Sequence, residues 1–362
     1  MHSYTMSDYV CDALIAEVFE RLPPKSIVRF IFLSKEWGSR IISPHFISKQ
    51  CLQSTKSPQK FMFQHEVAIQ GCPPEKFCTL HSEGQWPLCS VQGYVGIPRV
   101  DIPGGDRPMI VGSCNGVVCL YDSVEGGLIL WNPTIRRKLS LPNHIIGMVG
   151  FGFDGATDDY KVVTISDTKN DRHERESLVY SLRTGTWRAI ASSPTPFFSE
   201  EAFGCLVNGS LYWVVFRFVT ETERHYFLLS FYLGNEVFSC IQLPETSWET
   251  RQVLSIKGSL GVVSIALENH HETSWIWMRR DESWSVVYKV KGLEPEAQIL
   301  KVLPLTTNDD CLLNAYYEGF YICDLVTGVR SQFVEFGPRT RLIDMERYAE
   351  SILLLDRGVD CR

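Results

Sequence analysis

The chain has 362 residues, of which 44% are hydrophobic and 21% are charged, and its formal net charge is -7. This length suits a small module followed by a larger domain. The acidic balance argues against general binding to nucleic acid or anionic membranes, because both need a surplus of basic residues. No apolar run is long enough to span a membrane, and the N-terminus lacks the pattern of a signal peptide.

The 12 cysteines are scattered, with no CxxC pair and no metal-ligand spacing. Cys119, Cys205, Cys240 and Cys323 stand inside apolar runs, where cysteine packs as a small hydrophobic residue. Because no export signal is present, we expect reduced thiols rather than disulfides. We therefore expect no metal or other cofactor, and a location in the cytoplasm, the nucleus or both.

Two short helices are expected near the N-terminus. Asp12 can cap a first helix that ends at about Arg21. Pro23 and Pro24 must end this helix, because proline has no amide proton and its ring clashes with the preceding turn. A second helix is expected over residues 26–39.

Ser43 and Pro44 are expected to give another helix stop, followed by a short last turn. The apolar side chains of the two helices exceed what so small a core requires, which suggests a docking face for a partner. The expected divisions are a tail over 1–9, the helical module over 10–50, a polar joint over 51–59 and one large domain over 60–362.

After about residue 105 the pattern changes to short strands and turns. One strand–turn–strand element recurs five times, with markers at Pro133, Thr184, Gly234, Asp281 and Thr327. The markers are 51, 50, 47 and 46 residues apart. This is the length of a four-stranded propeller blade, closest to the kelch period of about 50 residues.

Each repeat divides into four strand-sized pieces. In the third repeat they span about 202–207, 210–216, 226–232 and 236–241. In the fifth they span about 299–304, 311–317, 319–325 and 329–333. The polar stretch 169–176 interrupts the second repeat and is expected to be a solvated loop, with a recognition role as the alternative.

Residues left over at the two ends offer a sixth blade. Residues 342–345 and 352–356 could supply inner strands, and 60–64 and 76–80 outer ones. Closing the ring in this way removes exposed sheet edges. We therefore expect a small α-helical module followed by an all-β, propeller-like domain of about six four-stranded blades. An irregular β-sandwich is the alternative.

Three short motifs follow one another in the helical module: Leu22-Pro23-x-Lys25-Ser26-Ile27-x-Arg29-Phe30, Lys35-x-Trp37 and Ile42-Ser43-Pro44-x-Phe46. Their arrangement resembles an F-box, the module that attaches substrate receptors to the Skp-type adaptor of cullin-based ubiquitin ligases. Matched by position, the resemblance implies six adaptor contacts: Leu22, Pro23, Ile27, Val28, Leu33 and Trp37. The other interpretation is that Leu33 and Trp37 only pack the core of the module, and both roles can hold together.

The large domain carries a second ordered series of motifs: GSCNGVVCL at 112–120, LWNPT at 130–134, GFGFD at 150–154 and DDYKVV at 158–163. This series resembles the kelch-like F-box-associated domain of plant F-box proteins. The motifs themselves favour structural roles. The Asn-Gly steps suit tight hairpins, and Asp158 and Asp159 are expected to cap or brace a turn before a strand over 160–165. Five tryptophans are expected to pack between blades: Trp131, Trp187, Trp213, Trp277 and Trp284.

No catalytic motif stands out. A GxSxG elbow, a phosphate-binding loop and an HExxH helix are all absent from the sequence. The stretch 181–187 is a near miss of the turn found in sialidase-type blades, but Arg183 replaces the aspartate. We therefore expect no enzyme and no catalytic residues.

The resemblances together imply the substrate-recognition subunit of a Skp-cullin-F-box ubiquitin ligase. The expected partners are a Skp-type adaptor, through it a cullin-RING ligase, and a target protein that the sequence does not identify. The alternative is a non-degradative interaction scaffold with a weak or idle F-box.

Overall fold

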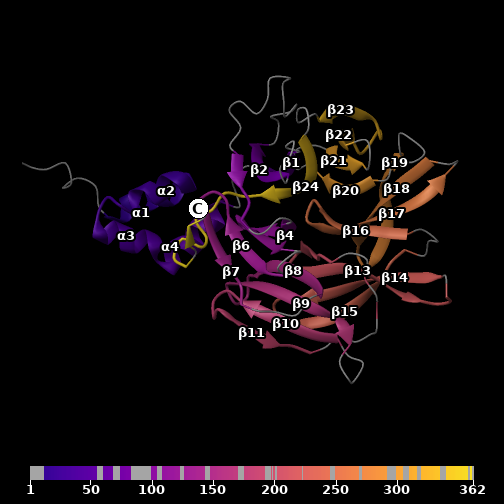
Figure 1. Ribbon diagram of the computed structural model, residues 1–362, viewed down its shortest axis with the longest axis horizontal. Coiled ribbons are helices and arrows are strands. Elements are labelled where there is room, and N and C mark those ends of the chain that lie inside the picture. Colours follow the sequence, from indigo (N-terminus) through magenta and orange to yellow (C-terminus); the bar gives the residue numbers. More distant parts are fainter. Residues whose placement is uncertain are drawn as a thin grey trace, which may run out of the picture.

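The structure is a computed structural model that describes residues 12–54, 60–67, 74–82, 99–103, 108–122, 126–142, 147–169, 175–191, 197, 199, 202–221, 223–244, 249–268, 271–291, 299–304, 310–315, 319–334, 340–357 and 359–360. These residues form four helices and six sheets. The helices gather at one side of the molecule, and the sheets are arranged radially beside them (Figure 1).

The helical module, residues 12–54, consists of α1 (Asp12–Arg21), α2 (Pro24–Phe30), α3 (Lys35–Ile42) and α4 (Pro44–Ser54). Helix α1 has the predicted bounds. Within the described residues, no helix is long and apolar enough to cross a membrane.

The prediction of one second helix over residues 26–39 is wrong, because this stretch is divided between α2 and α3. Ser34 begins α3: its backbone is extended, and its hydroxyl accepts a hydrogen bond from the amide of Trp37 at 3.1 Å. A serine that caps a helix start in this way interrupts the apolar periodicity without a proline or glycine.

The predicted helix stop at Ser43 and Pro44 is confirmed, since α3 ends at Ile42, but the prediction of only a short last turn is wrong: Pro44 begins α4, a helix of 11 residues. The Ser43 hydroxyl accepts a hydrogen bond from the amide of Phe46 at 3.3 Å. Proline is well tolerated in the first helical turn, where its missing amide proton has no partner to lose. Helix α4 runs to Ser54, through the first part of the predicted joint; residues 55–59 lie outside the described part of the chain.

The six sheets are the blades of a propeller, which confirms the predicted fold over the β-sandwich. Blade 1 holds β4 (Pro108–Cys114), β5 (Val117–Asp122), β6 (Leu128–Asn132) and β7 (Arg137–Ser140), with β25 (Val359–Asp360) at its outer edge. Blade 2 holds β8 (Gly147–Asp154), β9 (Asp159–Lys169), β10 (Arg175–Ser181) and β11 (Thr186–Ala189). Blade 3 holds β12 (Cys205–Val207), β13 (Ser210–Phe218), β14 (Arg224–Tyr232) and β15 (Val237–Gln242).

The second half of the ring repeats this plan. Blade 4 holds β16 (Glu249–Ile256), β17 (Ser259–Glu268), β18 (His271–Arg280) and β19 (Ser283–Lys291). Blade 5 holds β20 (Ile299–Pro304), β21 (Asp310–Ala315), β22 (Gly319–Asp324) and β23 (Arg330–Val334). The repeated sequence element is the turn between the third and fourth strands of each blade. The predicted loop 169–176 falls between β9 and β10, and residues 170–174 of it lie outside the described part.

Blade 6 closes the ring by joining the two ends of the large domain. Its order is β24 (Thr340–Tyr348), β1 (Lys60–Val67), β2 (Glu75–Ser82) and β3 (Arg99–Asp101), with β24 antiparallel to β1. The prediction of an inner strand at 342–345 is confirmed. The prediction of a second one at 352–356 is wrong: this segment is a turn, and its apolar side chains pack against α4 and blade 1.

Tryptophans join neighbouring blades, as predicted. The indole of Trp213 in blade 3 donates to the carbonyl of Val149 in blade 2 at 3.2 Å. Trp284 in blade 4 donates to the carbonyl of Gln242 in blade 3 at 2.8 Å. Each indole therefore combines apolar burial with a hydrogen bond across a blade junction.

The eight described cysteines are thiols that form no disulfide with one another. Of the four that were expected in the core, Cys119 and Cys323 are buried and Cys205 is half-buried. Cys240 is exposed, because it lies on the outermost strand of blade 3, β15.

Candidate functional site

Aromatic rings hold the core of the helical module together. The ring of Phe19 stacks on Phe30 at a centroid distance of 5.1 Å and meets Trp37 edge-on at 4.9 Å. Ile27 and Ile41 have no exposed surface. This core is completed by α4, whose Ile47 and Cys51 belong to the same cluster as residues of blades 1 and 2.

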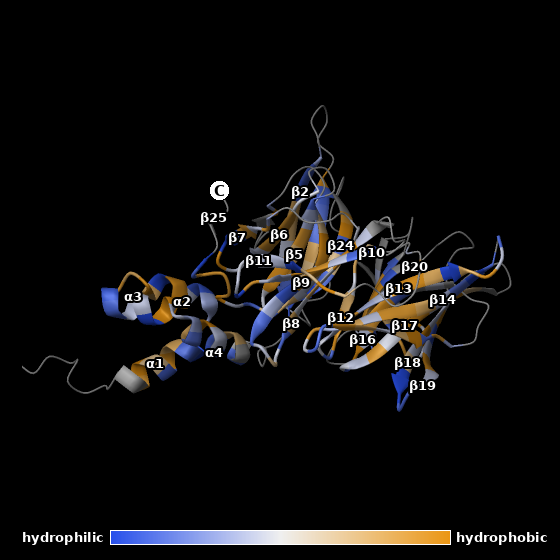
Figure 2. Ribbon diagram, turned by 90° about the horizontal axis from the view of Figure 1, so that it is seen from below, coloured by the Kyte–Doolittle hydropathy of each residue, from blue (hydrophilic) through white to orange (hydrophobic). Residues whose placement is uncertain are grey.

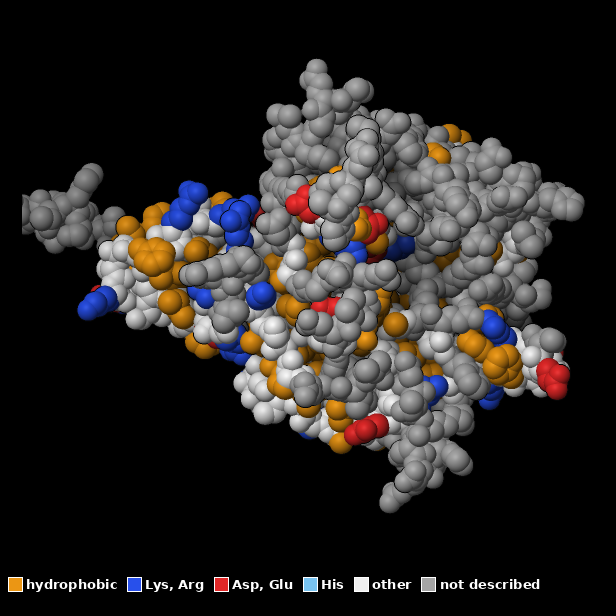
Figure 3. Space-filling view, in the orientation of Figure 1, with side chains coloured by type: hydrophobic (Ala, Val, Ile, Leu, Met, Phe, Trp, Pro, Cys, Tyr) orange, Lys and Arg blue, Asp and Glu red, His pale blue; other side chains and the backbone are white. Residues whose placement is uncertain are grey.

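A set of large apolar side chains on α1, α3 and the α2–α3 turn is left exposed. Phe32 is 88% exposed and Leu33 63%. The other members of this exposed apolar set are Leu14, Val18 and Ile42. Figure 3 shows hydrophobic side chains on the surface of the helical module beside Lys and Arg. Apolar surface of this kind, on a module that already has its own core, marks a site for a partner protein.

The six residues predicted to contact an adaptor fall into different environments. Leu33 and Pro23 are exposed. Leu22, Val28 and Trp37 are half-buried. Ile27 is fully buried, so its side chain supports the core instead of the surface.

Sequence reasoning gave no adaptor role to Phe32, the most exposed member of the apolar set. The reason is the helix break that went unrecognised. Residue 32 falls in the middle of the predicted second helix, whereas in the structure it lies in the turn before Ser34. Serine favours the first position of a helix, so Ser34 was the feature of the sequence that could have revealed this break.

Helix α4 is fixed to the propeller by polar and apolar contacts. The hydroxyl of Ser48 donates to the carboxylate of Asp158 at 3.2 Å, in the β8–β9 turn. The Gln50 side chain accepts a hydrogen bond from the amide of Ile352 at 3.3 Å. Burial raises the pKa of the Cys51 thiol to about 12, so this side chain stays protonated between α4 and the C-terminal turn.

Asn132 holds the C-terminal turn, residues 349–357, onto blade 1. Its side-chain amide donates to the carbonyls of Ser351 at 3.0 Å and Leu353 at 2.9 Å. Its side-chain oxygen accepts from the Tyr348 hydroxyl and the Thr134 amide. The Asn-Pro-Thr motif is therefore a clamp that presents the C-terminal turn to α4.

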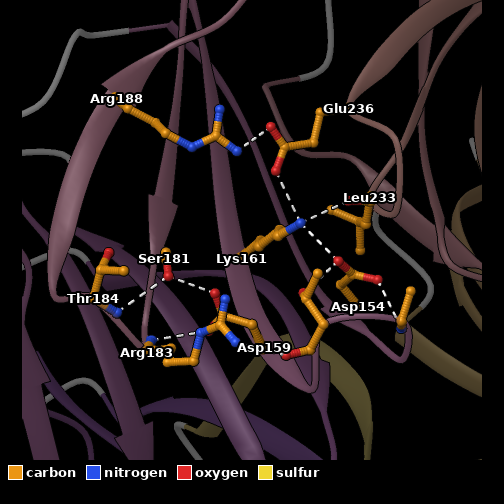
Figure 4. A network of polar contacts seen from close by, with 11 residues as sticks. Asp154, Asp159, Lys161, Ser181, Arg183, Thr184, Arg188, Leu233 and Glu236 are labelled. Atoms are coloured by element: carbon orange, nitrogen blue, oxygen red, sulfur yellow. Dashed lines mark hydrogen bonds and ion pairs between the residues drawn. The ribbon is translucent and has the colours of Figure 1, made fainter.

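The Asp-Asp-Tyr-Lys motif links blade 2 to blade 3 (Figure 4). The ammonium group of Lys161 lies 2.7 Å from Asp154 and 2.9 Å from Glu236, and it also donates to the carbonyl of Leu233 at 2.8 Å. Burial opposes the charge on Lys161, but the hydrogen bonds to the two carboxylates raise its pKa overall. Burial likewise acts to raise the pKa of Asp154, and the hydrogen bond from Lys161 reverses this and lowers it.

The prediction that both aspartates brace the turn before β9 is wrong for Asp159, which braces the turn between β10 and β11. Its carboxylate accepts hydrogen bonds from the Ser181 hydroxyl and, at 2.8 Å, from the Arg183 amide (Figure 4). The neighbouring Asp158 has a different role, because its carboxylate accepts a hydrogen bond from Ser48 of the helical module. Both aspartates thus have structural hydrogen-bond partners in other elements.

The innermost strands of the six blades line a central cavity of about 610 Å³. Lys301 of blade 5 lies in this cavity, 2.7 Å from Asp344 and 3.7 Å from Glu346 of blade 6. Burial raises the pKa of Glu346, because Lys301 compensates its charge only in part. These ion pairs join blade 5 to β24, the strand that closes the ring in blade 6.

A family profile described as the F-box associated beta propeller domain matches residues 94–306. The chain belongs to this family. A second profile, the F-box domain, matches residues 10–49. The helical module is therefore the F-box, and the F-box-associated propeller follows it in the same chain.

Curated relatives are plant F-box proteins. An F-box/kelch-repeat protein of Arabidopsis thaliana is 25% identical over 302 residues, which cover 77% of this chain and 79% of the relative. Another F-box protein of Arabidopsis thaliana is 27% identical over 359 residues, covering 83% and 81%. Among solved structures, TolB from Acinetobacter baumannii aligns with a TM-score of 0.45 at 9% identity, over 84% of this chain and 71% of TolB. No functional argument follows from a similarity at that level.

Proposed function

We propose that this F-box protein is a substrate receptor of a cullin-based ubiquitin ligase, acting in the cytoplasm, the nucleus or both. The helical module binds a Skp-type adaptor, and the propeller binds a target protein. The observation that carries the proposal is the exposed apolar set on a module that matches the F-box family. The rest of the ligase is recruited through the adaptor.

The chain performs no bond chemistry in this proposal. Its contribution is proximity: a target held on the propeller meets the conjugating enzyme at an effective concentration far above that of the free molecules. Proximity is useful only if the two ends keep a fixed separation. The contacts of α4 with Asp158 and Ile352 support this requirement, because they join the helical module directly to the propeller.

Direct measurement of adaptor binding tests the first half of the proposal. Purified Skp-type adaptor is titrated into the full-length chain by calorimetry, and into the Phe32→Ser/Leu33→Ser variant. We expect the double variant to bind at least about tenfold more weakly, because each exposed apolar anchor at an interface contributes roughly 1–2 kcal/mol. Val326→Ser is the matched control, since Val326 is 69% exposed but lies in blade 5. A lack of adaptor binding by the intact chain would overturn the receptor proposal.

The fate of the target separates the receptor from the scaffold alternative. Proximity labelling with the full chain, with and without a proteasome inhibitor, identifies proteins near the propeller. Labelled proteins that accumulate only under inhibition support degradation through the ligase. Labelled proteins whose amounts are unchanged by the inhibitor support a non-degradative role.

A further inference from the structure

The hairpin between β13 and β14 projects from blade 3 at the end of the sheet away from the helical module. In an antiparallel blade, successive turns alternate between the two ends of the strands. The helical module contacts the β8–β9 turn, which joins the first and second strands of blade 2. The β13–β14 turn joins a second and a third strand, so it lies at the opposite end. Figures 1 and 2 both show it on the far side of the propeller from the helices.

An apolar row runs from the core out along this hairpin, whose described residues 216–221 and 223–226 we call the blade 3 arm. Val214 and Leu228 are buried between blades 3 and 4. The next pair along the same face is Phe216 and Tyr226, followed by Phe218 opposite Arg224. The row therefore starts in the core and reaches the surface, where Phe218 is 46% exposed. Beyond it, Val219 is 60% exposed.

One arginine lies on the aromatic rings of the arm. The guanidinium of Arg224 is 4.6 Å from the ring centroid of Phe216 and 5.8 Å from that of Phe218. Arg217 lies on the other face of the blade, 5.9 Å from the ring centroid of Phe227, and is not part of this surface. A guanidinium stacked on a ring is held in place and still presents N–H groups at its edge, where a carboxylate can bind. Figure 3 shows the arm as hydrophobic and basic side chains together, with carboxylates at its tip.

We propose that the blade 3 arm is the docking site for the target protein. Its occupant is a target segment that carries an apolar side chain next to a carboxylate. The apolar side chain packs on Phe218, and the carboxylate meets Arg224, which lies on the same face of the hairpin. Rigid aromatic groups and arginines are the residue types that dominate binding energy at protein interfaces.

The acidic residues at the tip of the arm limit the kind of target segment that can bind. Glu221 and Glu223 are exposed in the turn beyond Phe218. Along the arm the charge thus changes from basic beside the rings to acidic at the end. A segment with a carboxylate at the rings and a neutral or basic residue toward the tip complements this order, whereas a uniformly acidic segment is repelled at the tip.

Because the target protein is unidentified, a random peptide display library supplies the probe. The library is selected on the full-length protein and counter-selected on the Phe218→Ser/Arg224→Gln variant. We expect the retained peptides to share an aromatic or aliphatic residue next to Asp or Glu. Retained peptides that lack this pair, or a selection that retains none, would overturn the proposal.

One retained peptide is then synthesised, together with a version whose acidic residue is replaced by Lys. Fluorescence anisotropy measures both against the intact chain, Phe218→Ser, Arg224→Gln and the control Val326→Ser. We expect about tenfold weaker binding for the Lys peptide and for each arm variant, and unchanged binding for the control. Equal affinity of the intact chain and Phe218→Ser contradicts the proposal. Thermal unfolding of each variant serves as the control that the substitution leaves the fold intact.

This inference rests on the proposed function, in which the propeller binds a target, but the two fail in different experiments. Adaptor titration of the arm variants should match that of the intact chain, because the arm is remote from the helical module. Peptide binding without adaptor binding removes the receptor proposal and leaves the arm as a docking site. Adaptor binding without peptide selection removes the arm and leaves the receptor.

Discussion

Gln50 and Ile352 are 302 positions apart in the chain, yet the side-chain oxygen of Gln50 accepts a hydrogen bond from the backbone amide of Ile352 at 3.3 Å. This contact places the end of the propeller against the last helix of the F-box. Asn132 holds the same C-terminal turn from the blade 1 side. The orientation of the two functional ends is therefore set by a segment that follows the last inner strand of the propeller.

Replacing Asn132 tests how much this clamp contributes. Asn132→Asp keeps the shape of the side chain but removes the amide that donates to Ser351 and Leu353, and it brings a charge toward their buried carbonyls. We expect the free energy of unfolding to fall by about 3 kcal/mol in chemical denaturation. Asn208→Asp is the control, because Asn208 also donates to a carbonyl, that of Gly258, but is exposed. Its loss should stay under about 1 kcal/mol, and an equal loss in both variants would refute the clamp.

Lys161→Met should destabilise the junction of blades 2 and 3. The change leaves the carboxylates of Asp154 and Glu236 near each other without their shared cation. Breaking a buried ion pair from one side costs about 3–5 kcal/mol. Arg21→Met removes an exposed ion pair with Glu17 and should cost less than about 1 kcal/mol. Denaturant titrations of both variants measure their free energies of unfolding. Similar unfolding midpoints for the two would contradict this role of Lys161.

The stability of blade 6 should depend on pH through His81. Burial lowers the pKa of His81 from 6.5 to about 4. The unfolded chain therefore takes up this proton near pH 6.5, whereas the folded chain resists until about pH 4. The stabilising effect is complete above pH 6.5 and is lost as the pH falls toward 4, by up to about 3 kcal/mol.

Unfolding measured between pH 7 and pH 4 tests this dependence. His81→Phe should flatten the loss of stability across that window. His45→Gln changes an exposed histidine on α4 and should leave the profile as it is in the intact chain. If His81→Phe and the intact chain lose stability in parallel, the assignment to His81 is wrong.

Ile27 and Leu33 should separate folding from adaptor binding. Ile27→Ala removes a fully buried side chain and should lower stability by about 2–5 kcal/mol. Leu33→Ala removes one that is 63% exposed, so stability should change by less than about 0.5 kcal/mol while adaptor affinity falls. Thermal unfolding and adaptor titration of both variants provide the comparison. Unchanged adaptor affinity in Leu33→Ala would exclude this residue from the interface.

Two glycines on innermost strands test the packing between blades. A methyl group on Gly150 would lie 2.6 Å from the ring of Trp213, whereas one on Gly112 meets nothing within 4 Å. Gly150→Ala should therefore cost about 1–3 kcal/mol of stability, and Gly112→Ala less than about 0.5 kcal/mol. Equal melting temperatures for the two variants would mean that Trp213 is not tightly confined.

The propeller could be predicted because residues that favour turns recur between its strand-sized apolar runs. The four pieces predicted for the third repeat lie within a few residues of β12 to β15. The segment 352–356 misled because its Ile and Leu residues have the composition of a strand, while their burial is against α4 and blade 1. Contacts between distant parts of the chain override local preference at such places.

The sequence could predict which stretch of the chain holds the candidate site, but not which of its side chains are exposed. Ile27 and Leu33 belong to the same apolar pattern, but one is buried and the other is exposed. The difference arises from the break at Ser34 and from the packing of α4, neither of which follows from periodicity. The arm of blade 3 had no sequence signal, because its aromatic residues continue an ordinary strand.

Ring closure by β1 and β24 has a consequence for synthesis on the ribosome. The last F-box helix ends at Ser54, but the strand that completes blade 6 begins only at Thr340. The F-box is thus translated long before the propeller can close, and until then the edge of β1 that pairs with β24 stays unpaired and prone to aggregation. A chain that stops before Thr340 carries an F-box without a closed propeller. Under the proposed function, such a fragment would occupy adaptors without a completed domain to hold a target.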